Sequence, residues 1–151
     1  MCTTYLTTII LQKLLKEKIE MLDYPNLIRL NPNIPWKTRG NAALCLRLKT
    51  NNPNKIFKIA KNNLIKYSES KKGKANSCLI MLCSEQVPDE IKKFAMKCLY
   101  ESVKMSELKQ IINSHEIKYF GQGTKRGLIG ALAAIGNTLL SDHTYELIGY
   151  R

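Results

Sequence analysis

The residues best suited to chemistry in this chain form a loop, Arg29–Asn41, here called the basic loop. It holds two prolines, the only tryptophan, several asparagines, and the cations Lys37 and Arg39. Because proline fixes φ and lacks a backbone N–H donor, Pro32 and Pro35 predict a stiff connection. Cations and side-chain amides on a stiff loop are suited to binding phosphate. A polar loop between two strands, anchored by its tryptophan, is the alternative interpretation, and the residue types alone leave both open.

A second candidate is the glycine turn, Gly121–Arg126, which follows a short apolar run and precedes a helical pattern. A strand, a glycine turn and a helix start together favour anion binding, because backbone N–H groups and the helix dipole point at the charge. Lys125 and Arg126 fall in the predicted first turn, where positive charge opposes the dipole unless an anion lies nearby. The glycine spacing matches neither a dinucleotide fingerprint nor a Walker loop. Small residues after the turn are also typical of a helix packed tightly on a sheet.

Few other side chains suggest catalysis. Thr3 and Thr4 stand where a helix is predicted to begin, and Thr at such a position is most often an N-cap. The carboxylates are dispersed and form no obvious pair. His115 and His143 are interpreted as surface or capping residues and do not complete a zinc pattern.

The five cysteines are odd in number and include no C-x-x-C pair, so we expect them to form neither disulfides nor a metal site. Cys45, Cys78 and Cys98 fall on predicted strands and on the apolar side of a predicted helix. They are therefore predicted to be small core residues.

Composition indicates one domain with a strong positive charge. The 151 residues suffice for a single core, and the net charge of +12 favours polyanionic partners such as nucleic acid. Lysines that only solvate a helix face are the alternative interpretation of this charge. No apolar run approaches the ~20 residues that span a bilayer, and the first residues lack a secretory signal, so a cytoplasmic protein is expected.

Helical and strand patterns alternate along the chain, and these elements must position the two candidate loops. The fold class predicted is α/β, a mixed sheet flanked by helices in a single compact domain. Helices are predicted over Thr3–Met21, Pro53–Tyr67, Pro88–Val103, Ser106–Asn113 and Thr124–Leu140. Strands are predicted over Leu27–Leu30, Ala42–Leu48, Ser77–Leu82 (fully buried, because the run is continuously apolar), Glu116–Phe120 and Thr144–Tyr150.

Four blocks in order along the chain resemble the archaeal agmatidine synthetase family, TiaS. The blocks are Met1–Leu6, Arg29–Asn41, Gly127–Gly136 and Thr144–Arg151. The resemblance implies an ATP-dependent ligase that activates the wobble cytidine of the AUA-decoding isoleucine tRNA and joins it to agmatine, forming agmatidine. It also implies that residues 1–151 correspond to the N-terminal ATP-dependent kinase-like domain, with the C-terminal part bordering the ferredoxin-like domain of the family.

The resemblance implies roles for particular residues. Thr3 corresponds to the phosphorylated threonine of the family, and Lys37 and Arg39 would neutralise ATP phosphates and the charge that develops in phosphoryl transfer. These are the expected catalytic residues. Residues expected to contact the nucleotide, or RNA in the case of the glycine turn, are Asn31, Asn33, Gly40, Asn41, Gly121, Gly123, Lys125 and Arg126.

One departure from the family concerns the metal. Members carry a short strand and an acidic Asp-Asp-Thr-Asp-Ser loop just before the Met-Cys-Thr-Thr block, and such carboxylates would hold Mg²⁺ with the phosphates of ATP. Here Met1 is the first residue of that block, a position that is internal in the family, so we expect an N-terminally truncated domain whose Mg²⁺ ligands lie upstream of Met1. Little or no activity is expected of the chain alone.

Two functions other than that of the family stay open from the sequence. One is a non-catalytic module that binds tRNA or a nucleotide. The other is an unrelated ATP-using kinase or ligase on the same scaffold. The partners expected from the resemblance are ATP, agmatine and the AUA-decoding isoleucine tRNA.

Overall fold

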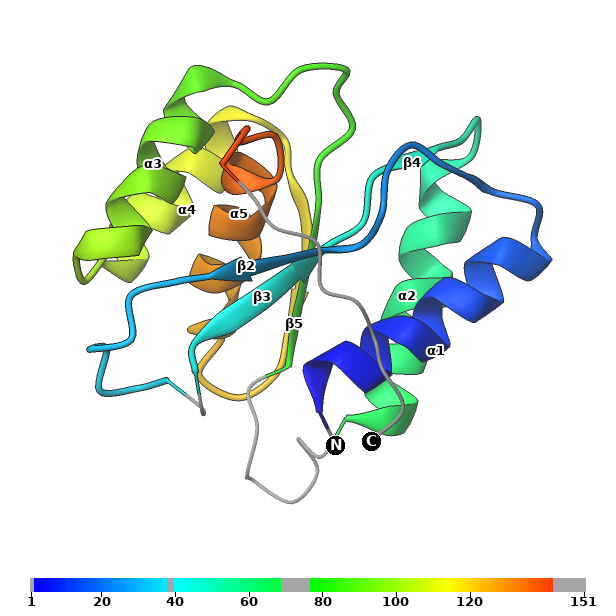
Figure 1. Ribbon diagram of the computed structural model, residues 1–151, viewed down its shortest axis with the longest axis horizontal. Coiled ribbons are helices and arrows are strands. Elements are labelled where there is room, and N and C mark those ends of the chain that lie inside the picture. Colours follow the sequence, from blue (N-terminus) through cyan, green and yellow to red (C-terminus); the bar gives the residue numbers. More distant parts are fainter. Residues whose placement is uncertain (1, 38–39, 69–76, 143–151) are drawn as a thin grey trace.

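The computed structural model describes residues 2–37, 40–68 and 77–142. Within these ranges the chain contains helices and short strands interspersed along its length (Figure 1). The helices are α1 (Thr3–Lys16), α2 (Pro53–Tyr67), α3 (Asp89–Tyr100), α4 (Met105–Ser114) and α5 (Gly127–Asn137). The strands are β1 (Glu20–Met21), β2 (Asn26–Arg29), β3 (Ala42–Cys45), β4 (Leu48–Lys49), β5 (Cys78–Met81) and β6 (Lys118–Gly121).

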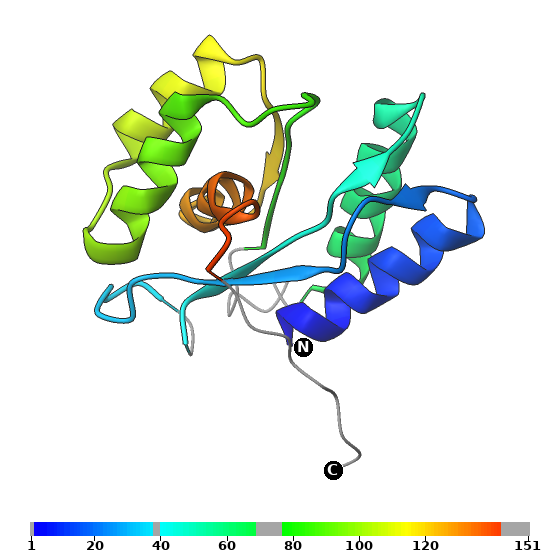
Figure 2. The same ribbon diagram turned by 45° about the horizontal axis from the view of Figure 1, so that its top comes forward.

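Helices lie on both sides of the strands, which confirms the predicted α/β class (Figures 1 and 2). Helices α3, α4 and α5 occupy one side, and the paired helices α1 and α2 occupy the other. The described strands form three antiparallel pairs, β1 with β4, β2 with β3 and β5 with β6, where one mixed sheet was predicted. Every residue of β3 and of β5 lines one open cleft.

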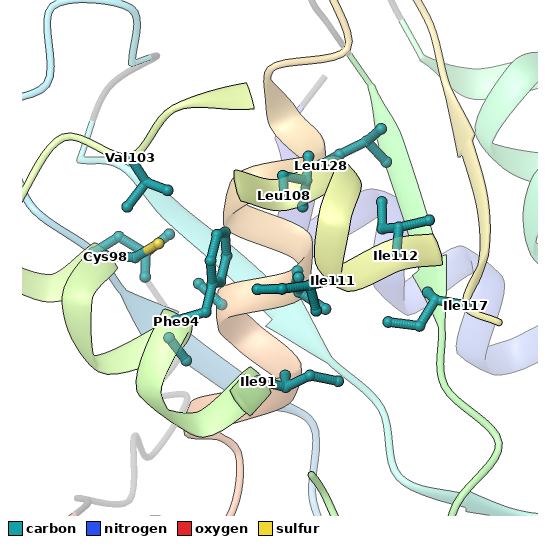
Figure 3. Close-up of a cluster of buried hydrophobic side chains, with 13 residues drawn as sticks. Ile91, Phe94, Cys98, Val103, Leu108, Ile111, Ile112, Ile117 and Leu128 are labelled. Carbon is teal, nitrogen blue, oxygen red and sulfur yellow. The ribbon is translucent and has the colours of Figure 1, made fainter. Parts of the chain in front are cut away.

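The larger core surrounds α5, which packs against α3 and α4 on one side and the strands on the other (Figure 3). Leu132, Ala133 and Ile91 are fully buried there. A Cβ atom at Gly136 would lie 2.6 Å from the carbonyl oxygen of Ile91, so α3 and α5 approach at a distance that only glycine permits. At Gly130 a Cβ would meet Leu30 at 3.3 Å. The small residues of α5 thus allow close packing, which was the predicted alternative to a role in anion binding.

The smaller core joins α1 to α2. Helix α2 begins as predicted, with Pro53 in its first turn and the Asn52 side chain accepting a hydrogen bond from the Lys55 N–H at 3.0 Å. Each helix contributes one buried stripe at helical spacing. The residues of the two stripes are Leu6, Ile10, Leu14, Ile56, Ala60 and Leu64.

Several predicted bounds differ from the structure. Helix α1 ends at Lys16, because Lys18 adopts a left-handed conformation (φ 56°) and Glu20–Met21 then pairs with β4 instead of continuing the helix. The predicted strand Ala42–Leu48 is divided into β3 and β4. Helix α5 begins at Gly127, because Lys125 is also left-handed (φ 59°).

Strand β5 is half-buried, where its continuous apolar run predicted full burial. Within the described residues it is paired along one edge only, with β6, and its other edge faces the cleft. The predicted strand Thr144–Tyr150 lies outside the described residues. No helix in the described part of the chain is both long enough and apolar enough to cross a membrane.

Candidate functional site

The ends of the basic loop are held together by asparagine side chains. The Asn31 Nδ2 donates to the carbonyl of Tyr100 at 2.9 Å, and its Oδ1 accepts from the Asn33 N–H at 2.9 Å. The Asn41 Nδ2 donates to the carbonyl of Asn31 at 2.7 Å, while the Leu30 N–H donates to the carbonyl of Asn41 at 2.9 Å. Asn41 is left-handed (φ 47°), a conformation that asparagine tolerates better than most residues. The loop is therefore stiff because of its asparagines as well as its prolines.

Trp36 does not anchor the basic loop. Its residue is 60% exposed, and its ring is covered by a guanidinium from the other candidate segment. The Cζ of Arg126 lies 3.8 Å from the centroid of the indole ring, a cation–π stack. This contact joins the basic loop to the glycine turn, two segments that are 90 residues apart in the sequence.

The glycine turn is held mainly by its own backbone. The Gln122 N–H donates to Ser77, the Lys125 N–H donates to Gln122, and Gly123 is left-handed (φ 60°). Gly121 packs against β5, because a Cβ there would lie 3.3 Å from the Cys78 Sγ and 3.1 Å from the Cγ of Lys125. Gly121 and Gly123 thus both have conformational or packing reasons to be glycine.

The start of α5 faces the thiol of Cys78. Burial raises the pKa of this thiol, while backbone N–H groups of Gln122, Leu128 and Gly127 point at the sulfur and oppose the rise. The backbone N–H groups that were predicted to bind an anion are therefore directed in part at the Cys78 thiol. The cationic side chain of Arg126 extends to Trp36 instead.

Thr3 is the first residue of α1 and is exposed. The N-cap is Cys2, and its side chain forms no capping hydrogen bond. The prediction that a threonine is the N-cap is therefore wrong. Thr4 instead contacts the Cys2 Sγ through its hydroxyl at 3.0 Å. The first-turn N–H groups of α1 consequently receive no hydrogen bond from the side chain of the N-cap residue.

An open cleft of about 1290 Å³ brings several of these parts to one surface. It extends from the start of α1 along β3 and β5 to the start of α5, and its volume exceeds the ~300–1,000 Å³ of common small-molecule sites. The predicted site residues that line the cleft are Thr3, Lys37, Gly40, Asn41 and Arg126.

The other predicted site residues are placed elsewhere. Asn31 is buried beneath the loop, Asn33 is exposed, and Gly121, Gly123 and Lys125 belong to the turn behind the cleft lining. Arg39 lies outside the described residues.

The sequence reasoning gave no binding role to Arg29 or Trp36, which also line the cleft. A Cβ at Gly40 would lie 2.8 Å from the Arg29 Nη1, so this guanidinium crosses the base of the loop. A binding role for Trp36 could have been predicted from the sequence, because it is the only tryptophan and lies among cations.

In the described ranges no three histidine, cysteine, aspartate or glutamate side chains gather closely enough to hold a metal ion. His115 lies away from the cleft, ends α4 and has its Nε2 2.7 Å from the Glu90 carboxylate. Its predicted surface or capping position is confirmed. His143 lies outside the described residues.

The amino-acid sequence of the chain was also compared with protein-family models and with known proteins. Residues 1–81, more than half of the chain, match the model of the TiaS TCKD domain, and residues 125–151 match that of the TiaS FLD domain. The chain belongs to the TiaS family. It is 38% identical, over its whole length, to the isoleucine-tRNA 2-agmatinylcytidine synthetase TiaS of Cenarchaeum symbiosum, of which it covers 33%.

Solved TiaS structures share the fold. A complex of TiaS with isoleucine tRNA and ATP superposes with a TM-score of 0.82 at 31% identity. A complex of TiaS with isoleucine tRNA, AMPCPP and agmatine superposes with a TM-score of 0.81 at 29% identity. Each alignment covers 90% of this chain and 32% of the other. The chain thus spans about a third of the length of the TiaS proteins it matches.

Proposed function

We propose that this chain carries the ATP-binding part of an agmatidine synthetase, the ligase that joins agmatine to the wobble cytidine of the AUA-decoding isoleucine tRNA. Relatives bear that name, and two similar structures are complexes with isoleucine tRNA and with ATP or an analogue. The observation that carries the proposal is the stack of Arg126 on Trp36, because it unites both phosphate-binding candidates at one cleft.

In this proposal the cations act by electrostatics. Lys37 and Arg39 of the basic loop and Arg126 of the glycine turn neutralise the phosphates of ATP and the charge that develops during phosphoryl transfer. Thr3 accepts a phosphoryl group on its hydroxyl. A phosphate at that position is favoured by the uncapped N-terminus of α1, whose N–H groups and dipole attract negative charge.

The remaining site residues position or contact the nucleotide. Asn33, Gly40 and Asn41 contact it from the basic loop, and Gly121, Gly123 and Lys125 contact a second phosphate or RNA from the glycine turn. Asn31 acts through the loop, because its amide is already bonded to backbone groups.

ATP use by the family suggests Mg²⁺, which prefers carboxylate and phosphate oxygens. Among the described residues no three histidine, cysteine, aspartate or glutamate side chains gather to hold such an ion, so these residues provide no ready-made carboxylate site for it.

We assign residues 1–151 to the kinase-like domain, with a C-terminal part that borders the ferredoxin-like domain; the two family models matched in this order support the assignment. As a part of a tRNA-modifying enzyme the chain would work in the cytoplasm, where tRNA is modified.

A second candidate is a module that binds tRNA or nucleotide without catalysis. In that case the basic loop and the glycine turn only contact the tRNA or the nucleotide. The net charge of +12 supports either function equally.

The two are separated by incubating the chain with ATP labelled on the γ-phosphate, agmatine and a transcript of the isoleucine tRNA. The synthetase proposal expects the label on Thr3 and an agmatine adduct on the wobble cytidine, detected by mass spectrometry. A transcript with uridine at that position and a Thr3→Val variant serve as controls, with Thr8→Val as the matched change on the same helix, because Thr8 does not line the cleft. Binding of tRNA with a steep salt dependence, but with no label on Thr3 and no adduct, would establish the module instead.

A further inference from the structure

The indole of Trp36 is more exposed than is usual for a tryptophan that stabilises its own loop. A tryptophan that anchors a loop buries its ring, yet Trp36 remains 60% exposed with a guanidinium stacked on it. Exposed aromatic rings of this size are typical of binding surfaces. One face of a flat ring suffices for Arg126, so the stack leaves ring surface available to a second planar partner.

The surroundings of the ring select for an anionic partner. Arg126 forms no ion pair with a carboxylate in the described ranges, and it stands at the N-terminal end of α5, where the helix dipole opposes a cation. Arg29 lies beneath Gly40 of the same loop, and it too has no carboxylate partner within the described residues. Lys37 follows Trp36 directly. An aromatic face among such cations is the arrangement that binds a base together with its phosphates.

The ring is also held in place before any ligand arrives. Pro35 precedes it, and both residues lie within a turn in which the Lys37 N–H donates to the carbonyl of Ile34 at 3.3 Å. The asparagine network fixes both ends of the loop, and Arg126 fixes the ring from a different part of the chain. A ligand that stacks here would therefore spend little binding energy on ordering the loop.

We infer that Trp36 and Arg126 form a stacking platform for a nucleobase that carries phosphate, with Arg126 holding the indole and the cations receiving the phosphates. The inference rests on the proposed function, which it deepens by naming the side chains that recognise the base. The base comes either from ATP or from an unpaired nucleotide of the tRNA, and both have the required chemistry.

Because Trp36 is the only tryptophan, its emission reports on the platform directly. The intact chain is titrated with ATP, with inorganic triphosphate, with the tRNA anticodon stem-loop and with the same stem-loop made abasic at the wobble position. Stacking predicts that the emission falls with ATP or with the stem-loop and does not change with the partner that lacks the base. The partner that produces the fall identifies the source of the base.

Affinities measured by calorimetry complete the test. Replacement of the ring in Trp36→Ala should weaken the base-carrying ligand about 5- to 150-fold, from ~1–3 kcal/mol per stacked base. The triphosphate affinity should change less than twofold, and Trp36→Phe should restore most of the loss. Tyr24→Ala removes an aromatic side chain that is 73% exposed and does not line the cleft, and it should change neither affinity.

Two results would overturn the stacking platform, and only the second would also overturn the proposed function. If ATP or tRNA binds but the emission and the Trp36→Ala affinity are unchanged, or if triphosphate alone quenches equally, the platform is wrong and the proposed function stands. If neither ATP nor tRNA binds by calorimetry, both are wrong.

Discussion

The two sides of the molecule are packed to different degrees. Around α5, on the side of α3 and α4, side chains such as Leu132, Leu108 and Ile91 are completely buried. On the side of α1 and α2, most core residues keep a few per cent of their surface exposed, and they share the cleft with half-buried strands. The proposed site lies where the two sides meet. Thr3 is the first residue of α1 on the second side, whereas the basic loop is bonded to the end of α3 and stacks on the start of α5 on the first side. The comparison indicates that the side of α3, α4 and α5 is a rigid support for the basic loop, and that the side of α1 and α2 is more accessible.

The largest effect should come from the tight contact between α5 and α3 on the rigid side. Gly136→Ala places a methyl group against the backbone of Ile91 and must separate α3 from α5, so we expect a loss of about 5 kcal/mol in the free energy of unfolding, or no folded protein. Gly130→Ala is the matched control on the same helix. Its Cβ meets only the end of the Leu30 side chain at 3.3 Å, so a change within about 1 kcal/mol is expected from urea unfolding. Equal losses for both variants would show that α5 is not tightly held by α3.

Core truncations compare the two sides directly. Leu132→Ala, fully buried in α5, should cost about 3–5 kcal/mol in unfolding free energy, because the surrounding helices cannot close the cavity. Leu6→Ala, which lines the cleft at the edge of the smaller core, should cost about 2 kcal/mol, because solvent can fill the space. A larger loss for Leu6→Ala would reverse the comparison.

The asparagine network should contribute less to stability and more to the shape of the basic loop. Asn31→Ala leaves the N–H of Asn33 and the carbonyl of Tyr100 without their partner, so a loss of about 1–3 kcal/mol is expected, with faster proteolysis within the loop. Asn33→Ala is the matched control, because the exposed Asn33 side chain forms no hydrogen bond among the described residues. If both variants have wild-type stability and proteolysis rates, the loop is not held by Asn31.

The smallest effect concerns a buried thiol on the rigid side. Burial, and to a lesser extent Glu107, raises the pKa of Cys98 to about 12 from the ordinary 9.0. Above pH 9 the unfolded chain loses this proton while the folded chain keeps it, so Cys98 makes stability fall as the pH rises from 9 towards 12. The slope attributable to this group approaches about 1.4 kcal/mol per pH unit. Unfolding of wild type and Cys98→Ala at pH 8–10.5 measures it, and parallel pH profiles would exclude it.

The sequence predicted the elements better than their relations. Pro53 after Asn52 was enough to place the start of α2, because a helix start is decided by local chemistry. The end of α1 was missed, because the apolar spacing of the segment continues past Lys18 while the backbone turns to pair Glu20–Met21 with β4. Long-range pairing of that kind leaves no local pattern.

For the candidate site, the sequence located both loops but not their contact. The basic composition of Arg29–Asn41 and the glycines after Phe120 could be read directly. That Arg126 stacks on Trp36, and that Asn31 bonds the basic loop to Tyr100, depend on how α5 packs against α3, β2 and β3. Those contacts join residues far apart in the chain, and only the folded structure brings them together.

The central claim is that the basic loop and the glycine turn form one nucleotide site. It is tested most directly by calorimetric titration of ATP into the wild type, Lys37→Ala, Arg126→Ala and the double variant. One shared site predicts that each single change weakens ATP binding about tenfold or more and that the two effects are coupled by at least about 0.5 kcal/mol. An unchanged ATP affinity in Arg126→Ala, beside a loss in Lys37→Ala, would contradict the claim and separate the two loops.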